Sequence, residues 1–133
     1  MEGHWTGTGT SKYLYSGKTE SFTVEVHSVV ESNQLNSTND VTSADGKTYS
    51  RVYLVLAKAP GQYVFNYVGV AHAPTSTGVF DGSVLKFEQV LGPDYTIHSE
   101  TRFPSPDRSV YTEVLWHDQN QLTQTEIQYT RIP

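Results

Sequence analysis

The 133-residue sequence contains no cysteine and a single methionine. The lack of cysteine excludes disulfide bonds, thiolate zinc sites and cysteine nucleophiles. No apolar run approaches the roughly 20 residues that a membrane-spanning helix needs, and the N-terminus lacks the basic-then-apolar pattern of a signal peptide. We therefore expect a cytoplasmic protein with no membrane partner.

Positive charge is also scarce. The chain has 9 Lys and Arg residues against 14 Asp and Glu residues, a formal net charge of -5 and a pI near 5.4. Such a chain lacks the basic face that binding to a phosphate backbone requires, so nucleic acid is not an expected partner. No Gly-x-Ser-x-Gly nucleophile motif is present. The Gly7-Thr8-Gly9 stretch lacks the Lys and the following helix of a phosphate-binding loop.

Apolar residues nowhere recur at helical spacing for three turns, whereas 9 Tyr, 5 Phe and 2 Trp accompany many Thr, Val and Ser residues. This composition is typical of β-strands. Alternation and turn residues predict strands over residues 4–15, 21–30, 48–56, 63–72, 83–91, 95–103, 109–117 and 121–132. The polar segment 31–46 is predicted to be a long loop. Residues 79–82 leave open a kinked strand or a short strand with a tight turn.

About eight strands joined by short connections favour one all-β domain over residues 1–133, an up-and-down antiparallel barrel that leaves no exposed edge. An indole from Trp5 at the start of the first strand could plug one end, and the guanidinium of Arg131 in the last strand could lie across it. This cation–π contact would join the two ends of the sheet. A barrel of eight strands holds side chains or one small ligand.

The Gly3-His4-Trp5 start, the meandering strands and Arg131 in the final strand resemble the calycin superfamily of lipocalins, fatty-acid-binding proteins and nitrobindin-like barrels. This resemblance implies a barrel that holds a small hydrophobic molecule, with isomerases, cyclases and chromophore-handling proteins among its relatives. Nitrobindin-like members bind haem through a histidine in the last strand. The corresponding segment 122–127 contains no histidine, so we expect neither haem nor another cofactor.

The most informative titratable residues lie in strand 95–103, where His98, Glu100 and Arg102 share one face. If faces of like polarity pair, Ile97 neighbours Val114, Tyr95 neighbours Trp116, and the polar face meets Tyr111 and Glu113. Two interpretations remain open. This face is either a solvated outer wall with cross-strand charge pairs, or the polar lining of a cavity where a carboxylate beside an imidazole moves protons.

Other strands repeat this ambiguity. Glu25 and His27 share the polar face of strand 21–30, and Arg51 and Tyr53 share a face of strand 48–56. Tyr67 and Trp116 belong to aromatic faces that could form part of a cavity wall. The predicted ligand-binding residues are therefore Glu25, His27, Arg51, Tyr53, Tyr67 and Trp116.

Three functional hypotheses follow. The first is a barrel that binds one mostly apolar small molecule and fixes it with a few polar groups. The second is a cofactor-independent isomerase, cyclase or lyase, with Glu100 or Glu113 as base, His98 as its partner, and Arg102 or Tyr111 stabilising an oxyanion. The third is a homodimer formed through an outer apolar face. His27, His98 and His117 lack metal-ligand spacing, so no metal site is expected.

Overall fold

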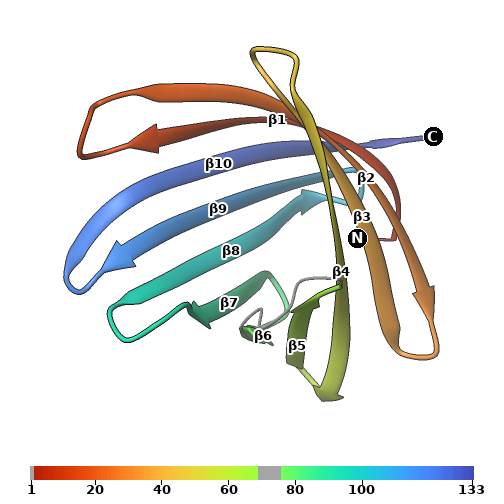
Figure 1. Cartoon of the computed structure of the whole chain (residues 1–133). Helices are drawn as coiled ribbons and strands as arrows, with labels where there is room; N and C mark the ends of the chain where they lie inside the picture. The colour runs from red at the N-terminus through yellow and green to blue at the C-terminus, as the bar shows by residue number, and fades with distance from the viewer. Residues whose placement is uncertain (1, 69–75) are drawn as a thin grey trace.

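The computed structural model describes residues 2–68 and 76–133, which form ten strands closed into one antiparallel barrel (Figure 1). Each strand pairs with the next along the chain, and β10 returns to pair with β1. The strands are β1 (Gly3–Tyr13), β2 (Thr19–Glu31), β3 (Gln34–Ser43), β4 (Thr48–Ala59), β5 (Gln62–Tyr67), β6 (Ser76–Phe80), β7 (Val84–Val90), β8 (Tyr95–Ser105), β9 (Arg108–His117) and β10 (Asn120–Ile132). No helix in this part of the chain is long and apolar enough to cross a membrane.

The prediction of an all-β antiparallel barrel is confirmed, but the barrel has ten strands and not eight. The predicted loop 31–46 is mostly strand β3. Its interior positions include Ser37 and Asn39, so it lacks the apolar alternation that reveals a strand in a sequence. Ser32 and Asn33 both have positive φ and make the tight turn from β2.

The second strand beyond the eight predicted is β6, which ends just before Asp81. Here the short strand with a tight turn is the correct alternative. Asp81 Oδ1 accepts hydrogen bonds from the backbone N–H groups of Ser83 at 3.0 Å and Val84 at 2.9 Å. This turn separates β6 from β7. Strand β5 ends at Tyr67, and residues 69–72 of the predicted strand 63–72 lie outside the described residues.

The two ends of the sheet meet as the sequence predicts. Trp5 and Arg131 are direct register partners in the β1–β10 pair, and the guanidinium carbon of Arg131 lies 4.6 Å from the centre of the indole ring. Trp5 is 1% exposed. Arg131 also donates a hydrogen bond to the carbonyl oxygen of Glu2 at 2.9 Å. These contacts hold both chain ends against one end of the barrel.

Among the described residues, the buried apolar side chains gather on the side built by the first three strands and β10. The buried apolar residues of the described chain are Trp5, Val24, Val26, Val41, Ile127 and Tyr129, with Phe22 and Tyr111 packed against them. Glycines make this packing possible. A Cβ atom on Gly9 would lie 2.5 Å from the ring of Phe22, and one on Gly7 would lie 2.7 Å from the ring of Tyr129. Gly7 and Gly9 of β1 therefore leave room for aromatic rings from the neighbouring strands.

Candidate binding cavity

The interior space that these core residues do not fill is a cavity of about 810 Å³. This volume lies within the range of roughly 300–1,000 Å³ that is usual for small-molecule sites. The cavity extends to Tyr13, Ala44 and Asp45, where Ala44 and Asp45 belong to the exposed turn between β3 and β4. It therefore opens to solvent at the end of the barrel opposite Trp5.

One wall of the cavity is aromatic. Phe65 of β5 lies at its centre, with ring centroids 4.7 Å from Tyr53, 4.9 Å from Tyr67 and 5.8 Å from Phe87. The strands β4, β5 and β7 carry these rings because alternate residues of each strand point inward. Gly78 of β6 leaves the space that the Phe87 ring occupies, since a Cβ there would lie 2.4 Å from that ring. This wall suits an apolar or planar molecule.

Polar groups line the cavity on both sides of this aromatic wall, from β3 and β4 and from β8 and β9. Tyr111 donates a hydrogen bond from its hydroxyl to Glu113 Oε1 at 2.7 Å. These residues are paired in register with Thr101 and Ser99 of β8, and both of those side chains are buried in the lining. A carboxylate that already accepts a tyrosine hydroxyl retains further acceptor positions for a ligand.

Arg51 is the cation of this cavity. Its guanidinium carbon lies 5.4 Å from the centre of the Tyr49 ring, and no carboxylate oxygen of the described residues lies within 4.0 Å of it. Burial lowers the pKa of Arg51, but the neighbouring Tyr67, Tyr49 and Glu113 outweigh burial and raise it overall. The side chain is solvent-accessible although it lines the interior, because the open cavity admits water. Arg51 is thus a permanent positive charge without a close carboxylate partner.

Three tyrosines of the interior resist ionisation. Burial, followed by the charge of Glu113 and the hydrogen bond to it, raises the pKa of Tyr111 well above its usual value. Burial also raises the pKa of Tyr53, against the opposing effect of hydrogen bonds to Ser37 and Asn39, and that of Tyr129. These hydroxyls therefore remain hydrogen-bond donors at neutral pH.

Five of the residues that the sequence singled out line the cavity together: Arg51, Tyr53, Tyr67, Tyr111 and Glu113. The expected β8–β9 register, which would have put the polar face of β8 on the same side as Tyr111 and Glu113, is wrong. Ile97 pairs with Leu115 and not with Val114, and Tyr95 pairs with His117 and not with Trp116. This shift by one residue puts Tyr111 and Glu113 inside the barrel and the polar face of β8 outside.

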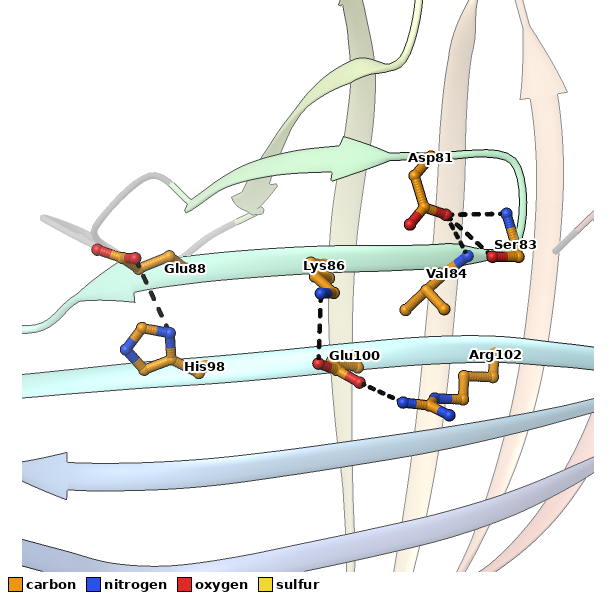
Figure 2. Close-up of polar contacts among 8 residues, drawn as sticks. All are labelled: Asp81, Ser83, Val84, Lys86, Glu88, His98, Glu100 and Arg102. Atoms are coloured by element: carbon orange, nitrogen blue, oxygen red, sulfur yellow. Dashed lines mark hydrogen bonds and ion pairs between the residues drawn. The ribbon is translucent and has the colours of Figure 1, made fainter.

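Figure 2 shows that outer face. His98 lies 3.8 Å from Glu88, and Glu100 lies between Lys86 at 3.9 Å and Arg102 at 3.2 Å. The solvated outer wall is therefore the correct interpretation for His98, Glu100 and Arg102, because these three residues alternate with the cavity-lining Ile97, Ser99 and Thr101. Their predicted placement in a polar lumen is corrected. Such exposed pairs contribute little to stability.

Glu25, His27 and Trp116 do not line the cavity either. Glu25 and His27 alternate with the buried Val24 and Val26 on β2 and are exposed. Trp116 alternates with Leu115, the register partner of the cavity-lining Ile97, and so belongs to the outer face. The expectation that these three residues hold a ligand inside the barrel is corrected in the same way.

The sequence analysis missed several small polar residues of the lining, among them Asn39, Ser76, Gln89 and Ser99. Ser76, Gln89 and Ser99 are buried. Their signal was weak, because a small polar residue on the inner face of a strand resembles an ordinary solvent-facing residue. Ser99 could have been found from its position between His98 and Glu100, once those were assigned to the outer face.

No protein-family model matches this sequence. No curated protein matches it either. Solved structures do match over 99% of this chain. The S-type phycobiliprotein lyase CPES from Guillardia theta has a TM-score of 0.75 at 10% identity, with 88% of its own chain covered. Rv2717c from M. tuberculosis has a TM-score of 0.73 at 19% identity, with 92% covered.

A third match is a protein of unknown function from the DUF3598 family of Nostoc punctiforme, with a TM-score of 0.68 at 9% identity. This chain corresponds to 48% of that protein. The matches show that this chain shares the β-barrel fold of these proteins. At these identities they establish the fold alone.

The raised pKa of Tyr111 leads to a prediction about alkaline stability. Tyrosines of the unfolded chain ionise near pH 10. A higher pKa in the folded state means that the contribution of Tyr111 to stability is complete below about pH 10 and is lost as the pH rises through the folded pKa. In urea unfolding between pH 8 and pH 11, Tyr111→Phe should reduce the slope with which stability falls. Tyr15→Phe, which removes a hydroxyl from a residue 75% exposed, is the control. Equal slopes in the two variants and the unchanged protein would contradict this account.

Proposed function

We propose that this protein binds one small, mostly apolar molecule that carries an anionic group. The observation that carries the proposal is the cavity of about 810 Å³, whose lining combines aromatic rings with Arg51, which lies on the same strand β4 as Tyr53. The aromatic wall supplies apolar contact area. Arg51 supplies a charge-assisted hydrogen bond to a carboxylate or a similar group.

Glu113 limits which ligands fit. It is near enough to raise the pKa of Arg51, and it would repel a second anionic group on the ligand. The Tyr111 hydroxyl faces this carboxylate, and Tyr53 is held by Ser37 and Asn39. A ligand with one anionic end near Arg51 and a hydroxyl or amide near Glu113 satisfies both groups.

An anionic fluorescent lipid tests this proposal. cis-Parinaric acid should bind with saturation, and Arg51→Met should weaken its affinity roughly 10- to 100-fold, because a hydrogen bond between charged groups contributes about 1.5–3 kcal/mol. The methyl ester of the same lipid should lose less than about threefold, since it lacks the charge that Arg51 recognises. Arg102→Met removes the same kind of charge from the outer wall and should change neither affinity. Absence of saturable binding, or equal losses for acid and ester, would overturn the proposal.

A second candidate function is cofactor-independent acid–base catalysis, and the hydrogen-bonded Tyr111–Glu113 pair inside the cavity favours it. Glu113 would accept a proton from a carbon beside a carbonyl group. Its protonation frees the Tyr111 hydroxyl from the carboxylate, and this hydroxyl would donate its hydrogen bond to the developing oxyanion. The residues predicted for this role on β8 contribute nothing to this arrangement. That a lyase has the same fold in Guillardia theta is compatible with such chemistry.

Hydrogen–deuterium exchange at carbon tests this alternative. A panel of apolar ketones incubated with the protein in D₂O should gain deuterium beside the carbonyl group, as measured by mass spectrometry. Glu113→Gln should abolish the exchange because the amide cannot accept the proton, and Glu100→Gln should leave it unchanged. Exchange that proceeds equally in Glu113→Gln, or no exchange with any ketone of the panel, would count against catalysis.

A cytoplasmic location and a homodimer remain predictions from the sequence.

A further inference from the structure

Two histidines and a glutamate gather on the outer surface of β1 and β2, away from the cavity. His4 and His27 are direct register partners, and Glu25 pairs with Thr6, two residues further along β1. These side chains point outward because their neighbours Trp5, Val24 and Val26 fill the interior. Each residue offers one ligand atom, and the three atoms lie within 4.8 Å of one another.

The position of the His4 ring leaves one nitrogen without a partner. The His4 and His27 rings are stacked, with centroids 4.0 Å apart and an angle of 21° between their planes. His4 Nε2 is buried and has no hydrogen-bond partner in the part of the chain that the structure describes. Its nearest ionic neighbour is Glu25 Oε2 at 3.8 Å, which is beyond hydrogen-bonding distance. A buried imidazole nitrogen without a hydrogen-bond partner, close to a carboxylate, is the arrangement of an unfilled coordination position.

The surroundings favour a cation. On β3, the register partners of Glu25 and His27 are Asp40 and Thr38. On the other side of β1, the partners of His4 and Thr6 on β10 are Ile132 and Thr130. None of these four flanking residues carries a positive charge, and Asp40 adds a second carboxylate beside Glu25. The local charge is therefore negative.

We propose that His4, His27 and Glu25 form a binding site for a divalent transition metal such as Zn²⁺. Two imidazoles and one carboxylate are a donor set that suits Zn²⁺ and its neighbours in the first transition row, with a fourth position open to water. Donors about 2.1 Å from a tetrahedral ion lie about 3.4 Å apart, so the three side chains must close slightly around it. His27 and Glu25 are exposed and can rotate to do so.

Such an ion would clamp β1 to β2 beside the sealed end of the barrel, because His4 directly precedes Trp5. The site is independent of the cavity and of its ligand. The sequence analysis considered His27, His98 and His117 for a metal. In the structure, His98 lies beside Glu88, and the His117 ring stacks on Tyr95 with centroids 4.5 Å apart. The potential ligands beside His27 are instead His4 and Glu25.

Calorimetric titration with Zn²⁺ of the full chain, without added histidines, tests the proposal. One ion per chain should bind, with affinity lowered at least tenfold by His4→Asn or His27→Asn and several-fold by Glu25→Gln. His98→Asn is the matched control, since His98 and Glu88 form an exposed pair at 3.8 Å, with no third ligand beside them among residues 2–68 and 76–133. That variant should bind Zn²⁺ as the unchanged protein does.

Cu²⁺ provides a second readout through Trp5. In a Trp116→Phe background, which leaves Trp5 as the sole indole, Cu²⁺ should quench fluorescence with saturation, and His4→Asn should abolish the quenching. Binding of cis-parinaric acid and circular dichroism check that each variant folds. Should His4→Asn unfold, His27→Asn and Glu25→Gln test the site from exposed positions. No saturable Zn²⁺ binding, or unchanged affinity in folded His27→Asn and Glu25→Gln variants, would overturn the proposal.

Discussion

The structure depends on one closure, the pairing of the first strand with the last around Trp5 and Arg131. Without it β1 and β10 would be sheet edges, with unpaired backbone groups open to association. The contact combines a buried indole, a guanidinium over its face and the carbonyl of Glu2. Because these residues seal one end of the barrel, the cavity opens at the other, with polar groups on both sides of its aromatic wall.

The closure also determines where the apolar core lies in the barrel. Glycines on β1 allow Phe22, Ile127 and Tyr129 to pack beside Trp5, so that the strands near the seam carry the apolar core. On the strands opposite the seam, the inward rings of Tyr53, Phe65, Tyr67 and Phe87 pack against one another and line the cavity without filling it. Ten strands also make a wider barrel than eight. The buried apolar core therefore lies near the seam, and Val24, Val41, Ile127 and Tyr129 of that core also line the cavity. Charged residues on the outer surface, such as those of β8, contribute to neither.

Much of this fold could be predicted from the sequence, because strands with apolar alternation and turn residues identify themselves. Strand β3 could not, since its inner residues Ser37 and Asn39 are polar. In the cavity, Arg51, Tyr53 and Tyr67 could be predicted as lining residues from the alternation of side chains along each strand alone. The β8–β9 register did not, because apolar and polar residues occur on both faces of these strands and a shift by one residue reverses every assignment. The His4–His27 pair could not be predicted either, because the first strand was expected to reach Tyr15, whereas β1 ends at Tyr13 and the register of the hairpin differs accordingly.

A double-mutant cycle at Trp5 and Arg131 tests the closure most directly. The free energy of unfolding is measured by urea denaturation for the unchanged protein, for Trp5→Leu, for Arg131→Met and for the double variant. A cation–π contact across the seam predicts a coupling free energy of about 0.5–2 kcal/mol between the two positions. Additive effects, with a coupling indistinguishable from that of Trp5→Leu with Arg102→Met, would contradict the account.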